Sequence, residues 1–531
     1  MSQSENGIEE LESIAIDLPQ ELEQDTSADP TVKWFWWFSI SHVVAWVVTC
    51  VLTQPNMPLD MVEMLFWGQQ WQLGYHKHPP LPAWIAAGTW WLSGGQAWLM
   101  YVVSQLTILV TFWAVWQLAR EGLSPKAAFC SVVVLEGCYY CAYMINDINN
   151  TIITRPFWAL AILFLYRAIS RTSKTQSNLN WCLAGVAIGL GMFSKYYIGV
   201  LVLAMLAVPV LIPQTRTRLK TVGPYLLAIV ACLVFLPHLL WMIDNDFVTI
   251  RYVFQRSDEK AVDVSAMRHL LAPIKFVASQ IGAFLPMLVL AWPMLSERKI
   301  RSRESDSDGQ LFYRYVSIVT LGPILIYVLL SAVSGASIRS MWGGPLFSFL
   351  GVWLFATFQL PADNRKVRKI IRDSIIVGVC MLLALVARNL SGPLLRDKLS
   401  RIHFPGAELA EALNGIWDSS NGGEGSELKV VGGHMFIAAS ASVYSQQHID
   451  VYAGLSEEAS PWINDEKFQS RGGMIVWEIL DDNSRAPDSR WLERFPGGKL
   501  LEPIRLNSRA IGGPHTVEVG VILVPAQKPR Q

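Results

Sequence analysis

Long apolar runs separated by short polar loops make up most of the chain between residues 34 and 390. Most runs hold about 17–25 residues, the length that an α-helix needs to cross a hydrocarbon core of roughly 30 Å. The stretch 81–94 is apolar but short and rich in Trp, so we expect it to lie in the membrane interface. The pattern predicts a polytopic α-helical membrane protein with about eleven spans. The predicted spans are 34–53, 96–119, 127–145, 151–168, 181–194, 196–213, 222–243, 273–295, 315–333, 342–359 and 374–390.

Composition supports a membrane protein. Hydrophobic residues make up 52% of the 531 residues and charged residues 16%, whereas soluble domains carry about 25% charged residues. All seven cysteines lie in apolar segments, so we expect no structural disulfide. These values exclude an ordinary soluble protein, and we expect no nucleic-acid partner.

Polar regions flank the membrane part on both sides. The first 30 residues hold nine Asp and Glu and no Lys or Arg, unlike the basic start of a signal peptide. We expect residues 1–32 to form a disordered acidic tail and residues 33–391 to form the membrane domain. Residues 392–531 alternate between short strand-like and helix-like segments, which predicts a separate small α/β domain.

Basic residues are distributed unevenly between the two sets of loops. One set carries 18 Lys and Arg, and the opposite set carries 7. The positive-inside rule places the richer set, and with it the N-terminus, in the cytosol. An odd number of spans then puts the domain 392–531 outside the cytosol.

The first external loop, residues 54–95, holds the candidate chemistry. Pro58 can start a helix, and Asp60 and Glu63 would then lie in its first turn, where the helix dipole favours anions. Their spacing of three places both carboxylates on one face, which Trp67 and Trp71 extend. We expect this helix to end at Gly74.

Lys77 and His78 follow the expected helix, directly before the stiff pair Pro79-Pro80. A carboxylate and a cation at a membrane surface suit the transfer of a group from a lipid phosphate. The carboxylate deprotonates a hydroxyl, and the cation holds the phosphate as it leaves. The alternative interpretation is a capped interfacial helix with a lysine that only extends its charge toward water.

This loop resembles the first periplasmic loop of the protein O-mannosyltransferase superfamily, which includes lipid A aminoarabinose transferases and rhizobial galacturonosyltransferases for lipopolysaccharide. The shared pattern is an acidic pair, an aromatic stretch, a glycine, and a basic residue or histidine before Pro-Pro-Leu. Many members have adjacent acids, whereas Asp60 and Glu63 are three apart. The segment Ser194-Lys195-Tyr196 also resembles a family segment. The resemblance implies the GT-C glycosyltransferase fold, with a small extracytoplasmic domain.

The resemblance also implies roles for single residues. Asp60 is expected to be the catalytic base, with Glu63 beside it. The expected ligands of the donor are Lys77, His78, Lys195, Tyr196 and Arg251, with Trp67 holding the prenyl chain or the sugar. The polar group at 146–150 adds Asp147 and Asn149 as candidates for lining the substrate site, although a simple polar turn is the alternative.

The function implied is transfer of a sugar from a polyprenyl-phosphate donor to an extracytoplasmic acceptor at a bacterial inner membrane. The acceptor can be lipopolysaccharide, another glycolipid or a protein, and a single displacement by a hydroxyl that Asp60 activates inverts the anomeric carbon. No cofactor is firmly implied, although His76 and His78 could hold a divalent metal with the nearby acids. Arg256 and Arg268 are expected to be solvated loop charges.

A transporter or lipid flippase is the alternative function. It predicts buried charges in both halves of the membrane part. Only Glu136 lies clearly at mid-depth of a predicted span, where a carboxylate costs about 2.5–3.5 kcal/mol on insertion scales. We therefore expect Glu136 to be paired or to face a cavity.

Overall fold

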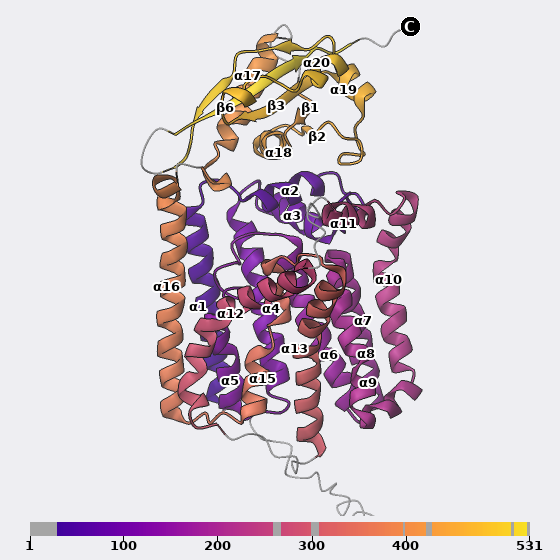
Figure 1. Ribbon diagram of the computed structural model, residues 1–531, viewed down its shortest axis with the longest axis vertical. Coiled ribbons are helices and arrows are strands. Elements are labelled where there is room, and N and C mark those ends of the chain that lie inside the picture. The colour runs from indigo at the N-terminus through magenta and orange to yellow at the C-terminus, as the bar shows by residue number, and fades with distance from the viewer. Residues whose placement is uncertain are drawn as a thin grey trace, which may run out of the picture.

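The computed structural model describes residues 29–258, 267–298, 307–396, 399–420, 427–510 and 515–527. A body of long helices carries a separate α/β domain at one end (Figure 1). Most of the expected acidic tail, residues 1–28, lies outside the described residues. The domain boundary expected near 392 falls inside the last long helix, which runs on to Arg396.

Seven helices in the described part of the chain are long and apolar enough to cross a membrane. They are α1 (Pro30–Thr53), α4 (Trp98–Ala119), α6 (Asn150–Ser170), α10 (Gly223–Asp244), α12 (Met267–Leu295), α13 (Ser307–Ser334) and α16 (Asn364–Arg396). The most hydrophobic window of α6 is 78% buried within the chain and that of α10 only 11%. Helix α6 therefore lies at the centre of the body, and α10 presents its apolar surface to lipid.

The remaining predicted spans are shorter, less apolar or broken. Counting each bent pair as one span raises the number to nine within the described residues, rather than the eleven expected. One bent pair joins Tyr196–Leu211, which includes α8 (Gly199–Leu206) and α9 (Val208–Leu211), to the 3₁₀ helix η4 (Pro213–Lys220) at 107°. The other joins Ser340–Leu346, which includes α14 (Gly343–Leu346), to α15 (Leu350–Phe358) at 57°. Helix α7 (Lys174–Ser194) has the length of a span but begins with polar residues.

The expected span 127–145 is wrong as a continuous helix. Helix α5 (Pro125–Val133) passes into a short 3₁₀ turn, η2 (Val134–Gly137), and Cys138 is extended. Gly137 packs so closely on α12 that a Cβ there would lie 2.5 Å from the backbone nitrogen of Met287. The Tyr139 N–H then donates to the Ala283 carbonyl oxygen at 3.0 Å, so α12 supplies the partner that the broken helix lacks.

Three short helices lie between the long helices and the α/β domain (Figure 1): α2 (Leu59–Gly68), α3 (Leu81–Leu92) and α11 (Val248–Asp258). Helix α2 ends at Gly68 rather than at the expected Gly74, and α3 crosses α2 at Gly68. A Cβ at Gly68 would lie 2.1 Å from the Ala83 carbonyl oxygen. Gly74 has a different reason to be glycine, since a Cβ there would lie 2.2 Å from the Trp241 ring.

The C-terminal domain is a mixed sheet flanked by helices, in agreement with the predicted α/β pattern. The strand order is β2-β1-β3-β6-β4, and β5 also pairs with β6; β2, β1 and β3 are parallel, whereas β6 runs antiparallel to β3. Strands β4 and β5 and helix α20 were not predicted. The elements are α17 (Gly406–Ser420), β1 (Val430–Gly433), α18 (Met435–Tyr444), β2 (Asp450–Ala453), α19 (Asp465–Arg471), β3 (Gly473–Ile479), α20 (Ser489–Arg494), β4 (Lys499–Leu500), β5 (Ile504–Asn507) and β6 (Thr516–Val524).

Helix α18 fixes the C-terminal domain on the first external loop. Apolar residues of α2 and α18 belong to one buried cluster. The Tyr444 hydroxyl accepts from the Met57 backbone N–H at 3.1 Å, and the Gln70 amide donates to Asp450 at 2.9 Å. The C-terminal domain therefore covers α2 and shields the side chains beneath it from water.

Candidate active site

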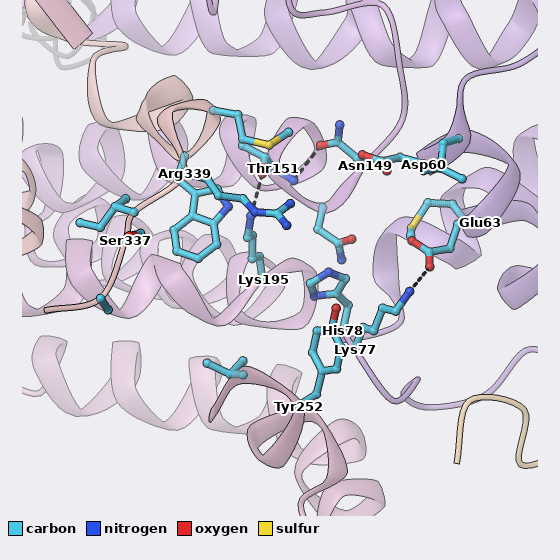
Figure 2. A pocket seen from close by; sticks show the side chains of 18 of the residues that line it. Asp60, Glu63, Lys77, His78, Asn149, Thr151, Lys195, Tyr252, Ser337 and Arg339 are labelled. Atoms are coloured by element: carbon cyan, nitrogen blue, oxygen red, sulfur yellow. Dashed lines mark hydrogen bonds and ion pairs between the residues drawn. The ribbon is translucent and has the colours of Figure 1, made fainter. Parts of the chain in front are cut away.

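A cavity of about 450 Å³ opens where the loops at one end of the long helices meet the C-terminal domain. Its wall includes α2, the residues after it, the start of α6, the end of α7, α11 and the segment before α14, and Met435 of α18 also reaches it. Figure 2 shows the polar side chains from these separate elements pointing toward a common space. Because the polar groups come from distant parts of the chain, only the folded structure brings them together.

Asp60 lies on the cavity wall in the first turn of α2. Within the described residues its carboxylate makes no hydrogen bond or ion pair, so it is free to accept one from a ligand. Burial raises the pKa of Asp60 above its ordinary value, and the charges of Lys195, Lys77 and Arg339 oppose this rise. The expectation that the helix dipole simply keeps Asp60 ionised was therefore incomplete, since desolvation acts in the opposite direction.

Asp147 lies behind Asp60 rather than on the cavity wall. Burial raises the pKa of Asp147 well above its ordinary value, and the charge of Asp60 raises it further. The backbone N–H groups of Ile148 and Met61 and the side chain of Asn149 oppose this rise. The Asp147 Oδ1 is shielded from solvent and has no hydrogen-bond partner among the residues that the structure describes. The two carboxylates therefore form an interacting pair that favours holding a proton.

Asn149 joins this acidic pair to the cavity wall. Its side chain caps α6, accepting from the backbone N–H groups of Thr151 and Ile152 at 3.0 and 3.1 Å. Asn149 itself lines the cavity. The polar turn expected at 146–150 is thus a helix cap as well as a part of the cavity wall.

Glu63 and Lys77 form an ion pair on the part of the wall next to Asp60, with Nζ 2.6 Å from Oε1 (Figure 2). Trp67 does not line the cavity; it is buried and stacks on Tyr75 at 5.2 Å between ring centroids. The Lys77 ammonium lies 5.6 Å from the centroid of the Trp67 ring. Trp67 therefore supports Lys77 from behind, and the expectation that it holds the prenyl chain or the sugar is corrected.

Lys195 extends into the cavity from the end of α7. Its Nζ donates to the Thr151 Oγ1 at 2.7 Å and lies 5.2 and 5.0 Å from the ring centroids of Tyr197 and Trp342. Burial lowers the pKa of Lys195 to about 7; the charge of Asp60 opposes this and that of Arg339 adds to it. The ammonium has no carboxylate within ion-pair distance in the described part of the chain.

The structure does not bring every predicted residue into the cavity. His78 lines it, whereas Arg251 does not, although its neighbour Tyr252 does. The Tyr196 hydroxyl lies 2.5 Å from the His238 Nε2 and donates to Thr249 at 2.8 Å, which ties α10 to α11. Tyr196 is therefore part of the packing beside the cavity.

The possible metal ligands are His76 and His78. Burial and the charge of Lys77 lower the pKa of His76 to about 3, which keeps it neutral. Among the described residues no three His, Cys, Asp or Glu side chains gather closely enough to hold a metal ion. His76 instead packs edge-on against Trp67 and Tyr252, with centroids 5.7 and 5.8 Å away.

Sequence reasoning missed Arg339 and underestimated Arg268, both of which line the cavity. Arg256 and Arg268 were both expected to be solvated loop charges, and this is wrong for Arg268. The side chain of Arg256 lies outside the described part of the structure. The only signal for Arg268 and Arg339 in the sequence was that both belong to the set of loops with few basic residues. Arg339 lies in the bend before α14, and no motif in the sequence predicted that this bend reaches Asp60.

Sequence comparisons place the chain beside known membrane enzymes. Residues 77–241 match the family model described as dolichyl-phosphate-mannose-protein mannosyltransferase. The lipopolysaccharide core galacturonosyltransferase RgtB of Rhizobium johnstonii is 23% identical over 481 residues, which cover 89% of this chain and 93% of RgtB. The lipid A galacturonosyltransferase RgtD of the same organism is 24% identical over 274 residues, or 50% of this chain and 54% of RgtD.

Structural comparison gives a likeness over the whole chain. The crystal structure of ArnT from Cupriavidus metallidurans bound to undecaprenyl phosphate has a TM-score of 0.64 at 12% identity, and the match covers 95% of this chain and all of ArnT. The apo structure of the same ArnT gives a TM-score of 0.61. At this level of identity the likeness establishes the fold.

Proposed function

We propose that this chain, a member of the GT-C superfamily of membrane glycosyltransferases, moves a sugar from a polyprenyl-phosphate donor to a lipopolysaccharide acceptor. The superfamily and the fold, which the first external loop had predicted, are confirmed by the family model, the relatives and the ArnT likeness together. The protein is a multi-pass membrane enzyme. The donor, the acceptor and the roles of single residues are the proposal.

The observation that carries the proposal is the contrast between the two acids of α2. The Glu63 Oε1 forms an ion pair with the Lys77 Nζ at 2.6 Å, whereas Asp60 lines the cavity without a hydrogen bond or ion pair among the described residues. A general base must have a lone pair available for the proton that it removes. We therefore assign the catalytic base to Asp60 and a positioning role to Glu63.

Burial adjusts the basicity of Asp60, and Asp147 lies close enough to interact with it. A general base works best when its pKa lies near the operating pH. The pKa of an ordinary aspartate lies well below neutral pH, so such a side chain is only a weak base there. Burial raises the pKa of Asp60, and Asp147 behind it provides a second carboxylate within electrostatic reach. The pair can take up the proton of the acceptor hydroxyl as that oxygen attacks the sugar.

The leaving phosphate needs positive charge on the other side of the anomeric carbon. Lys77 and Arg339 both line the cavity and act electrostatically on Asp60. Glu63 occupies one donor of the Lys77 ammonium and leaves others for phosphate, and the planar Arg339 guanidinium suits two phosphate oxygens. The bond from the anomeric carbon to the phosphate oxygen breaks as the new bond to the acceptor oxygen forms, so the configuration inverts.

The relatives suggest which substrates to test first. RgtB and RgtD are named as galacturonosyltransferases for the lipopolysaccharide core and for lipid A, and ArnT was solved with undecaprenyl phosphate. We accordingly propose a polyprenyl-phosphate galacturonate as donor, at a bacterial inner membrane, with the C-terminal domain outside the cytosol. The transporter alternative gains nothing from Glu136, whose carboxylate lies 2.7 Å from the His42 Nδ1 and is therefore paired.

Radiolabel transfer tests the proposal. The purified full-length protein in liposomes receives polyprenyl-phosphate [¹⁴C]galacturonate and lipopolysaccharide, and label on the lipopolysaccharide is counted. Label on the lipopolysaccharide is the expected result. Movement of the labelled lipid between leaflets without any transfer would instead support the transporter.

A further inference from the structure

Lys195 is a basic side chain of the cavity to which the proposed reaction assigns no role. Its ammonium is half-buried between the rings of Tyr197 and Trp342 and is held by the Thr151 hydroxyl at 2.7 Å. No carboxylate pairs with it in the described parts of the chain. Such a cation, kept in an enclosed place without a counter-ion, is costly unless a ligand supplies the negative charge.

The cavity wall holds charged side chains of both signs. Of the described residues, four basic side chains line the cavity and two carboxylates do. The phosphodiester of a polyprenyl-phosphate sugar carries one negative charge, and the carboxylate of an acidic sugar adds a second. The basic residues are Lys77, Lys195, Arg268 and Arg339, and the carboxylates are Asp60 and Glu63.

The position of Lys195 in the cavity indicates which part of the donor binds to its ammonium. Arg339 is exposed, whereas Lys195 is half-buried beside it and flanked by aromatic rings. A phosphate that carries a long prenyl chain must stay near an opening of the cavity, so the enclosed end is left for the sugar. Trp342 lines the cavity next to Lys195 and offers an apolar face for a sugar ring.

We propose that Lys195, positioned by Thr151 and Trp342, binds the carboxylate of an acidic donor sugar and thereby selects a hexuronate over the corresponding neutral hexose. This inference rests on the function proposed above. In a hexuronate the anomeric phosphate and the carboxylate-bearing carbon are attached to the two carbons that flank the ring oxygen. Two neighbouring anions then match two neighbouring cations, with Arg339 at the phosphate and Lys195 at the carboxylate (Figure 2).

A pair of donors that differ only at C6 tests this assignment. The wild-type protein is assayed with polyprenyl-phosphate galacturonate and polyprenyl-phosphate galactose, and selectivity is the ratio of the two kcat/KM values. We expect the wild type to prefer galacturonate by at least about 10²-fold, because galactose leaves the ammonium unmatched. Transfer of galactose as efficient as that of galacturonate by the wild type would overturn the inference.

Variants separate the carboxylate from the phosphate. Lys195→Met should reduce the selectivity ratio to within about tenfold of unity, and Lys195→Arg should restore part of it. Lys77→Met, the matched control, should lower kcat/KM for both donors by a similar factor and keep the ratio. A Lys195→Met protein that loses both donors equally would make Lys195 a phosphate ligand and overturn the inference.

Two further outcomes keep the test decisive. If Lys195→Met does not fold, as judged by gel filtration in detergent, Thr151→Val takes its place. It keeps the shape of the side chain but removes the hydroxyl that holds the ammonium, and a lower selectivity ratio is expected. An unchanged ratio in Thr151→Val would contradict the inference. Failure of the wild type to transfer either sugar would instead refute the proposed function itself.

Discussion

The ammonium of Lys77 lies 2.6 Å from the carboxylate of Glu63, a contact between residues fourteen positions apart in the first external loop. The loop folds back on α2 because the Tyr75 hydroxyl donates to the Trp67 carbonyl oxygen at 2.7 Å and the two rings stack. The contact gives the two acids of α2 different roles, because Glu63 is held in an ion pair and only Asp60 remains available to accept a proton. It also places the lysine on the wall of the cavity.

Glu63→Gln tests the positioning role. The amide keeps the shape but not the charge, so Lys77 loses its ion pair and becomes less well placed for phosphate. We predict a donor KM higher by about 3–10-fold and a kcat within about threefold of wild type. A donor titration at saturating acceptor separates the two constants, and a collapse of kcat at unchanged KM would contradict the positioning role.

Lys77→Ala tests the phosphate contact. Removal of the ammonium should raise the donor KM by about 10-fold or more, and Lys77→Arg should keep much of the affinity. Lys174→Ala is a suitable control, because Lys174 is an exposed lysine at the start of α7 outside the cavity. An unchanged KM in Lys77→Ala would reduce Lys77 to a lysine that merely extends to the membrane surface.

Lys195 predicts a pH dependence for the acidic donor. Burial places its pKa at about 7, so the ammonium loses its charge as the pH rises through that value. The charged groups that face it are Asp60 and Arg339, while Thr151, Tyr197 and Trp342 are uncharged there. The donor KM should therefore rise above about pH 7, by up to about tenfold per pH unit.

The same pH series on Lys195→Arg checks the cause. A guanidinium stays charged throughout this range, so the rise in KM above about pH 7 should flatten in the variant. A wild-type KM that does not change between neutral and alkaline pH would show that Lys195 does not meet an anion of the donor. A rise that persists unchanged in Lys195→Arg would assign it to another group.

Orientation in the membrane is a separate prediction, which rests on the contrast of 18 to 7 basic residues between the two sets of loops. Alkaline phosphatase fused after Gln531 should be active, and green fluorescent protein at the same site should be dark, because both report an extracytoplasmic end. The reverse result would place the cavity on the cytosolic side and would require a cytosolic acceptor.

Much of the membrane body could be predicted, because apolar length alone identifies helices such as α1, α4 and α10. The breaks could not, since hydropathy does not distinguish a continuous span from α5, which stops where Gly137 meets α12. That break matters for the site. The segment after it is free to leave the helix and carry Asp147 to Asp60.

The candidate site was predictable only where its residues are close in sequence. Asp60, Glu63 and Lys77 lie in one loop with a recognisable pattern, and all three line the cavity. Arg339 comes from a bend far along the chain, and its arrival depends on tertiary packing that no local pattern encodes. Arg251 has the charge expected of a phosphate ligand, yet it is the neighbouring Tyr252 that reaches the cavity, because one step along α11 changes the direction of the side chain.

Turnover of Asp60→Asn tests the catalytic assignment most directly. Label transfer from polyprenyl-phosphate galacturonate to lipopolysaccharide is measured in liposomes at saturating donor and acceptor, with Glu63→Gln as the matched control from the same helix. We predict that Asp60→Asn lowers kcat by about 10²–10⁴-fold, because the amide cannot accept the proton, and leaves donor binding close to wild type. Full turnover in Asp60→Asn together with an inactive Glu63→Gln would make Glu63 the base, and full turnover in both would place the chemistry outside this cavity.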